Sequence, residues 1–297
     1  VVDGAILTIE PGTIIKAAPG SGSNASTLII TTGSKIMALG TKEEPIIFTS
    51  LQEAPIGARG LWGGVIILGK ATGSFSGNVD KCQIDGIPAS DLAGLYGGNN
   101  NNDNSGIFQY VSIRHGGTEI GEGNEINGLT LGCVGDGTII DNIEVMDNVD
   151  DGIEFFGGTV NATNLLVWGQ GDDGLDIDQG YAGTISNAMI VLTQVSDHAL
   201  EIDGPEGANA GSFMIDGVTI IGATENCSAL GVDGEIADFR KAATGICSNI
   251  LVQDFAFGKD VELDNIADAT NYANGTLNFI NWEVITNCGV TISDIFK

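Results

Sequence analysis

The stretch DDGLDIDQG, residues 172–180, places four carboxylates on an apolar pattern that is typical of a β-strand. Leu175 and Ile177 alternate with Asp176 and Asp178, so each pair would point to one face of the strand. The same pattern recurs on both sides of it along the chain. The segments that align with it are DDGIEFFGG (150–158), DHALEIDGP (197–205), SALGVDGEI (228–236) and KDVELDNIA (259–267).

This alignment produces two mainly acidic columns that are two residues apart. The strand pattern is kept while the spacing between repeats varies from 22 to 31 residues, which predicts a solenoid with loops of unequal length. The first column reads Glu154, Asp176, Glu201, Gly231 and Glu262, and the second reads Phe156, Asp178, Asp203, Asp233 and Asp264.

A second repeated feature lies between these strands. Segments such as DNIEVMD and TNLLVWG carry an asparagine or a glycine at one fixed place, preceded by short runs such as GTII and GTVN. We expect this column to form a ladder of side-chain amides that closes a turn. Its members are Asn142, Asn164, Asn187, Gly217, Asn249 and Asn281.

Each repeat therefore holds about three short strands, and no segment shows a helical period. We predict an all-β fold, a right-handed parallel β-helix of about nine to ten rungs, in one domain over residues 1–297. Two Gly- and Asn-rich segments, near 81–106 and 115–128, interrupt the coil and are expected to be side loops.

The composition limits the function. The chain has 39 acidic and 11 basic residues and a net charge of -28. Such a surface repels nucleic acid and anionic membranes and attracts cations, and it suits a secreted protein. No apolar run reaches the length of a membrane span. The five cysteines show no CxxC and there are two histidines, so zinc is disfavoured; Cys227–Cys247 is the first disulfide to expect among Cys82, Cys133, Cys227, Cys247 and Cys288.

Several motifs in fixed order resemble those of a large family of secreted or surface-attached bacterial β-helix proteins. The resemblance covers nearly the whole chain. It implies the fold and an extracellular or outer-surface location, implies no particular reaction, and leads us to expect a further strand ahead of VVDGA. The motifs are LTIEPGTIIK (7–16), PIIFTS (45–50), LWGGVIILGKA (61–71), YGGNNNNDNSG (96–106), NEINGLTLG (124–132), FFGGTVNA (155–162) and DDGLDIDQGY (172–181).

In a parallel coil, Asp176 would lie between Glu154 and Glu201, about 4.8 Å from each. Such stacked charges repel one another unless they are solvated, protonated or bound to cations. One interpretation is that these carboxylate side chains extend into water and accept hydrogen bonds from turn amides. Another is that they form a calcium site. The expected ligands are Asp150, Asp151, Glu154, Asp172, Asp173, Asp176, Asp178, Asp197, Glu201 and Asp203.

Catalysis is a third interpretation. NVDDGIEF and GDDGLDI loosely resemble the aspartate motifs of polygalacturonases, with His198 in a supporting role, but the Arg-x-Lys and Gly-His-Gly segments of that family are missing. A catalytic centre is usually unique, whereas this feature is periodic. The leading hypothesis is therefore a structural β-helix protein of the bacterial surface, stabilised by calcium and associating through its solenoid ends into filaments or a surface layer. The alternative is a polysaccharide-binding or polygalacturonase-like protein.

Overall fold

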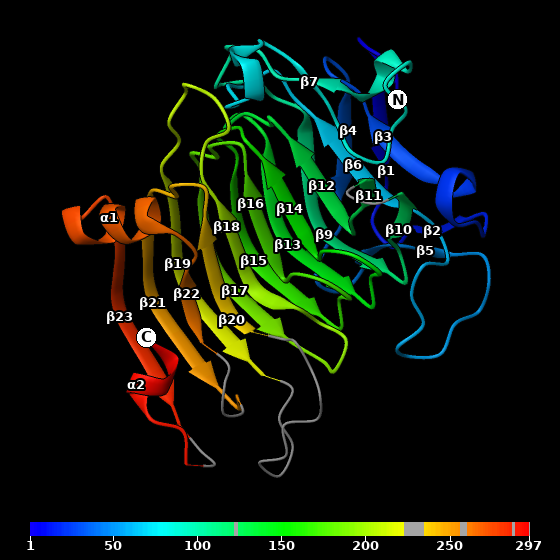
Figure 1. Ribbon diagram of the computed structural model, residues 1–297. Coiled ribbons are helices and arrows are strands. Elements are labelled where there is room, and N and C mark those ends of the chain that lie inside the picture. Colours follow the sequence, from blue (N-terminus) through cyan, green and yellow to red (C-terminus); the bar gives the residue numbers. More distant parts are fainter. Residues whose placement is uncertain (122–123, 223–234, 256–259, 287–288, 297) are drawn as a thin grey trace.

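The chain coils into a right-handed parallel β-helix, as the repeats predicted (Figure 1). The computed structural model describes residues 1–121, 124–222, 235–255, 260–286 and 289–296. The N-terminal rungs lie at one end of the solenoid and the C-terminal rungs at the other, so position along the chain becomes position along the coil axis.

The larger of the two long sheets has 11 strands, and those that neighbour one another run parallel. Its main path runs in the order β1-β4-β9-β13-β15-β17-β19-β21-β23, and β2 and β5 complete it beside β9. The strands are β1 (Ile6–Ile9), β2 (Ile14–Ala17), β4 (Lys35–Leu39), β5 (Ile46–Ser50), β9 (Gly106–Arg114), β13 (Ile139–Met146), β15 (Asn161–Trp168), β17 (Thr184–Val191), β19 (Phe213–Ile221), β21 (Gly245–Gln253) and β23 (Leu277–Ile285).

The smaller sheet has eight strands and carries the acidic repeats. Its order, β22-β20-β18-β16-β14-β12-β6-β3, follows the chain from one end of the solenoid to the other. The strands are β3 (Thr27–Ile30), β6 (Gly64–Leu68), β12 (Leu129–Gly132), β14 (Ile153–Phe156), β16 (Leu175–Asp178), β18 (His198–Asp203), β20 (Glu235–Arg240) and β22 (Val261–Leu263).

Apolar side chains fill the space between the two sheets. Ile153, Leu175 and Leu200 lie in register on successive strands and have no exposed surface. The ring of Phe155 in β14 packs against the ring of Tyr181, which follows β16, at 4.9 Å between centroids. Burial of this continuous apolar column is the main favourable contribution to folding, and it fixes which face of each strand points outward.

The asparagine column explains why most rungs contain two strands rather than three. Asn142, Asn164 and Asn187 have φ values of 55°, 57° and 55°, and Gly217 at the same place has 72°. This left-handed residue bends one strand of the larger sheet instead of ending it. The side-chain amides also form the expected ladder, since Asn187 donates to Asn164 and Asn164 donates to Asp141 at 2.7 Å.

Short elements outside the two long sheets occupy both expected side loops. In the first, β7 (Cys82–Gln83) pairs with β8 (Leu95–Tyr96), and in the second, β10 (Thr118–Gly121) pairs with β11 (Asn124–Ile126). Both pairs are antiparallel, whereas neighbouring strands of the coil are parallel. These loops therefore lie beside the coil and are not part of its rungs. The 3-10 turns are η1 (Gly22–Asn24), η2 (Ser76–Asn78) and η3 (Leu92–Gly94).

Two helices lie at the C-terminal end, although no helical period was found in the sequence. The helix α1 (Ile266–Asn274) begins where the Asn265 side chain accepts hydrogen bonds from the amides of Ala267 and Asp268. Helix α2 (Ile292–Ile295) is a single turn. Both are too short for a periodic pattern to stand out, and the cap was the detectable signal. No helix in the described residues is long and apolar enough to cross a membrane.

The sequence alignment was wrong at one rung. In the smaller sheet the strand next to β18 is β20, and in this pairing Asp238 lies opposite Glu201 and Arg240 lies opposite Asp203. The sequence pattern instead predicts Gly231 and Asp233 at these places. Both lie outside the described residues, as does Cys227, and Cys247 is a buried free thiol, which does not support the expected Cys227–Cys247 pairing.

The asparagine bends give a test of the fold. Asn187→Ala should lower the free energy of unfolding by about 1–2 kcal/mol, because a Cβ without a local hydrogen bond disfavours positive φ. Asn187→Gly keeps the backbone freedom and loses only the amide, so its loss should be smaller. Urea denaturation measures both variants. An alanine variant as stable as the wild type would contradict this explanation of the bends.

Candidate functional site

The outer face of the smaller sheet carries an acidic pocket of about 280 Å³. Strands β14, β16, β18 and β20, with the turns that precede the first three, form its floor, and the two side loops contribute one residue each. Ten acidic residues and one arginine line it: Asp85, Glu125, Asp150, Asp151, Glu154, Asp172, Asp173, Asp176, Asp197, Glu201 and Arg240.

The strand register brings the predicted carboxylates together. Glu154 pairs with Asp176, Asp176 with Glu201, Glu201 with Asp238, and Asp238 with Glu262, so one acidic column crosses five strands. Eight of the ten predicted ligands line the pocket: Asp150, Asp151, Glu154, Asp172, Asp173, Asp176, Asp197 and Glu201.

The other two, Asp178 and Asp203, are not among the pocket-lining residues. Asp203 is 4% exposed and accepts from Arg240 Nε at 2.7 Å and from Lys241 Nζ at 2.6 Å. Asp178 accepts a hydrogen bond from the amide of Gln179 at 2.7 Å. Asp203 therefore has its positive partners within the chain and is a poor candidate for a metal ligand.

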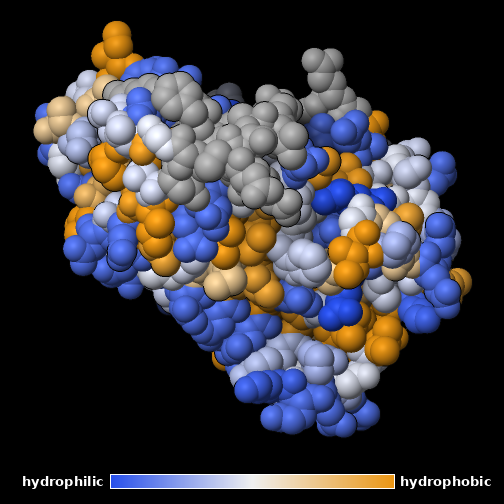
Figure 2. All heavy atoms as spheres, turned by 90° about the horizontal axis from the view of Figure 1, so that it is seen from below, coloured by the Kyte–Doolittle hydropathy of each residue, from blue (hydrophilic) through white to orange (hydrophobic). Residues whose placement is uncertain are grey.

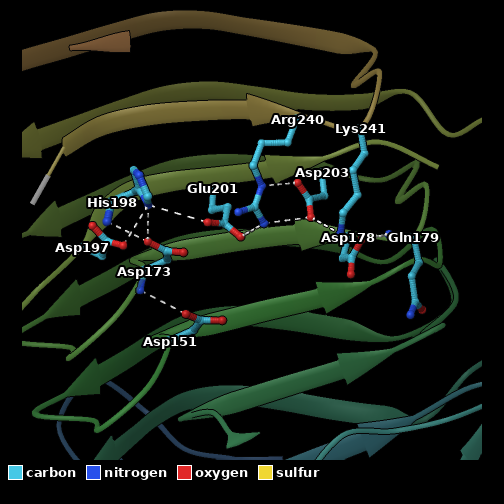
Figure 3. A network of polar contacts seen from close by, with 10 residues as sticks. All are labelled: Asp151, Asp173, Asp178, Gln179, Asp197, His198, Glu201, Asp203, Arg240 and Lys241. Atoms are coloured by element: carbon cyan, nitrogen blue, oxygen red, sulfur yellow. Dashed lines mark hydrogen bonds and ion pairs between the residues drawn. The ribbon is translucent and has the colours of Figure 1, made fainter. Parts of the chain in front are cut away.

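Arg240 is one of three pocket residues that the sequence analysis missed; the other two, Asp85 and Glu125, come from the side loops. Its guanidinium lies between two carboxylates, bonding Glu201 on one side and Asp203 on the other (Figure 3). Burial by itself would lower the pKa of Arg240. The hydrogen bond to Asp203 and the charge of Glu201 raise it by more than burial lowers it, so the pKa is raised overall and the side chain stays protonated. The alternation of Ala237 and Phe239 inward with Asp238 and Arg240 outward was the signal that could have found this strand.

His198 is the second internal cation of this face. Its Nδ1 lies 2.9 Å from Asp173, 3.6 Å from Asp197 and 3.7 Å from Glu201 (Figure 3). Burial alone would lower the pKa of His198, but the hydrogen bond with Asp173 and the three negative charges raise it to about 9. The imidazolium therefore neutralises part of this end of the pocket at neutral pH.

A group of five carboxyls remains that forms no ion pair with a basic side chain in the described part of the chain; we call it the unneutralised cluster. Burial is the largest cause that raises each pKa, followed by a neighbouring carboxylate. The pKa of Asp150 rises to about 8 and that of Asp172 to about 6. The cluster consists of Asp150, Asp151, Glu154, Asp172 and Asp176.

The polar contacts around this cluster leave some oxygens unused. Asp151 accepts from the amide of Asp173 at 3.0 Å, and Glu154 accepts from Asn127. Asp176 Oδ1 is fully buried and has no hydrogen-bond partner. A buried, unpartnered carboxylate oxygen costs about 1–3 kcal/mol, and more when the group is charged, so something must compensate it.

The geometry suits a hard cation. Asp150, Asp151 and Asp172 each offer an oxygen within 4.8 Å of the others, and Asp151, Glu154 and Asp176 form a second such group. Calcium binds six to eight oxygens at about 2.3–2.6 Å, so its ligands can lie up to about 5 Å apart. The two groups share Asp151, which is 5% exposed.

The fold and the pocket together define a parallel β-helix protein with a carboxylate-rich site on one sheet. The chain belongs to the family described as pectate-lyase-like beta helix domain, whose model matches residues 1–294. No curated protein matches it.

Two solved structures of pectin methylesterase from Aspergillus niger are similar to the chain, each with a TM-score of 0.41 and 13% identity. The penultimately deglycosylated form aligns over 98% of this chain and 81% of its own, and the deglycosylated form over 99% and 89%. A likeness this distant does not extend to chemistry.

The pocket predicts how stability depends on pH when divalent cations are removed by a chelator. Carboxyls in the unfolded chain ionise near pH 4, whereas Asp150 and Asp172 in the folded chain have pKa values of about 8 and about 6. The folded form therefore binds more protons, and its stability falls as pH rises from about 4 to about 8. His198, with its raised pKa, adds to this fall above about 6.5.

Calorimetry should show a melting temperature that decreases between pH 5 and pH 9. In the Asp150→Asn variant the side chain at position 150 cannot ionise, so the decrease in melting temperature with pH should be smaller. A wild-type melting temperature that rises over this range would contradict the buried, protonated carboxyls.

Proposed function

We propose that this protein is an extracellular structural β-helix whose acidic pocket binds calcium. The observation that carries the proposal is the unneutralised cluster, in which buried carboxyls from adjacent rungs share one pocket with their oxygens within 4.8 Å. The chain neutralises Glu201 and Asp203 with Arg240 but provides no such partner for Asp151, Glu154 and Asp176 in the described residues.

Calcium would act here as a structural ion rather than as a catalyst. Asp151, Glu154 and Asp176 lie on the turn before β14 and on β14 and β16, so an ion shared by them would link two rungs. It would remove the repulsion between stacked carboxylates and replace the protons that those groups otherwise retain. Extracellular calcium sites are usually weak, with dissociation constants of about 10⁻⁴–10⁻³ M.

The net charge of -28 supports an extracellular location, because salt outside the cell screens the repulsion between the charges.

Association through the solenoid ends stays a prediction from the sequence. It is supported by exposed apolar side chains on the outermost strands of the larger sheet, namely Ile6 and Ile14 at one end and Ile280 and Ile285 at the other. From below, hydrophobic residues occur in groups between hydrophilic ones (Figure 2).

Calcium should raise the melting temperature. At a free concentration 100 times the dissociation constant, one bound ion stabilises the folded form by about 2.7 kcal/mol. For a chain of this size that corresponds to roughly 4–5 °C. Calorimetry in calcium and in chelator measures the shift.

The double variant Asp151→Asn, Glu154→Gln should lose the shift. The control Glu43→Gln, Glu44→Gln removes the same two charges from exposed positions far along the chain and should keep it. Equal melting temperatures of the wild type in calcium and in chelator would contradict the proposal.

A carbohydrate-active enzyme is the second candidate, favoured by one observation. The pocket holds a carboxyl that keeps a proton near neutral pH, Asp150, whose pKa is raised to about 8, which is the property of a general acid. Proton abstraction by Arg240 is not supported, because its two carboxylate partners keep it protonated. A net charge of -28 also disfavours acidic polymers.

Incubation with neutral and acidic polysaccharides, followed by an assay for reducing ends, tests this candidate. The structural proposal predicts no product from the wild type or from Asp176→Asn. Product that appears with the wild type and disappears with Asp176→Asn would favour the enzyme instead.

A further inference from the structure

A second pocket, of about 420 Å³, lies at the N-terminal end of the smaller sheet; we call it the apolar pocket. It is bounded by η1, by β3 and by both side loops. No charged side chain of the described residues lines it. Ligand pockets usually measure about 300–1,000 Å³, so this volume suits a small organic molecule. The apolar side chains that line it are Ala25, Ile29, Ile87, Pro88, Ile120 and Ile126.

Packing and hydrogen bonds hold the walls of the apolar pocket in place. Ile126 is 3% exposed and belongs to an apolar cluster separate from the core between the sheets, and Ile29 and Ile87 pack against this cluster. The amide of Gly22 donates to Thr118 Oγ1 at 2.7 Å, which ties η1 to β10. The pocket is therefore formed before a ligand arrives, and binding does not have to order its walls.

The hairpin of β10 and β11 borders both the apolar pocket and the acidic pocket. Glu125 lines the acidic pocket, and Ile126, the next residue of β11, lines the apolar pocket. Successive side chains of a strand point to opposite faces, which explains why neighbours in the sequence serve different pockets. Glu119 of β10 pairs with Glu125, while Ile120 lines the apolar pocket. The hairpin thus has one acidic and one apolar face.

The first side loop borders both pockets in the same way. Asp85 lines the acidic pocket, whereas Gly86 and Ile87 line the apolar pocket. The two loops touch at this point, since a Cβ placed on Gly86 would lie 2.2 Å from Ile126 Cγ1. Partial removal from water, followed by the charge of Glu125, raises the pKa of Asp85 to about 6, so these two carboxyls lie close together. The boundary between the pockets therefore carries negative charge.

We propose that the apolar pocket binds a small organic amine with an apolar body, whose ammonium group pairs with Asp85 and Glu125 at the boundary of the acidic pocket. The apolar body displaces water from the isoleucine side chains. An anionic ligand such as a fatty acid is disfavoured, because it meets these carboxylates and a net charge of -28. The inference does not rest on the proposed calcium site, since neither Asp85 nor Glu125 is a member of the unneutralised cluster.

Three ligands of equal chain length test the charge preference: octylamine, octanol and octanoate. Each is titrated into the full chain by calorimetry at neutral pH, in a chelator so that calcium does not affect the outcome. Octylamine, which is protonated at this pH, should bind as one molecule per chain. Octanol should bind about fivefold more weakly, the difference that a partly exposed ion pair supplies. Octanoate should not bind. Octanol or octanoate binding as tightly as octylamine would overturn the proposal.

Substitutions in two separate walls test the location. Ile29→Thr in β3 and Ile87→Ser in the first side loop each remove apolar surface, and each should weaken octylamine binding by about tenfold. The control Ile139→Thr removes an isoleucine that is 47% exposed on β13 of the larger sheet, and it should bind octylamine like the wild type. Circular dichroism checks that each variant is folded, and either wall variant alone suffices if the other does not fold.

The double variant Asp85→Asn, Glu125→Gln tests the partner of the ammonium group. It should bind octylamine and octanol equally. The control Glu43→Gln, Glu44→Gln removes the same two charges from exposed positions and should keep the preference for octylamine. A preference that survives in Asp85→Asn, Glu125→Gln, or octylamine binding that is unchanged in the folded wall variants, would overturn the site. Neither result bears on calcium binding by the unneutralised cluster.

Discussion

Parallel stacking of acidic side chains on the smaller sheet is the constraint on which the rest of this structure depends. Neighbouring rungs place Glu154, Asp176, Glu201, Asp238 and Glu262 in direct register. Two like charges at about 4.8 Å repel by roughly 0.9 kcal/mol in water and several times more near a protein surface. The apolar core fixes the register, so a strand cannot slip to relieve this repulsion without exposing its buried residues.

The chain relieves the repulsion in different ways along the column. At β18, Glu201 and Asp203 bond to Arg240, Lys241 supports Asp203, and His198 neutralises Asp173. In the unneutralised cluster, raised pKa values mean that carboxyls retain protons when no cation is present. Calcium is the proposed replacement for those protons. The internal cations thus neutralise the middle of the acidic column and leave the unneutralised cluster to one side of it.

The fold could be read from the sequence because its signal is repeated. Alternation of apolar and acidic residues at 153–156 and 175–178, and asparagines at the bends, specify the strands and their faces rung by rung. Eight of the ten predicted ligands consequently lie in the pocket. The repeats cannot show how far the loops reach across the sheet, so Asp85 and Glu125, which come from the side loops, were not anticipated.

Unequal spacing caused the one register error. Asp238 lies 37 residues after Glu201 and 24 before Glu262, whereas an evenly spaced repeat pointed to Gly231. That error hid Arg240, and with it the neutralised middle of the acidic column. A local pattern predicts which residues face outward, but the partner of each side chain depends on loop lengths that pattern alone does not determine.

The central claim is that the unneutralised cluster binds a divalent cation, and anomalous diffraction tests it most directly. Crystals grown with calcium and exchanged with terbium should show an anomalous peak within about 2.6 Å of carboxylate oxygens of Asp151, Glu154 and Asp176. A map at the same terbium concentration with no peak in the pocket, and those carboxylates bridged only by water or by shared protons, would contradict the claim.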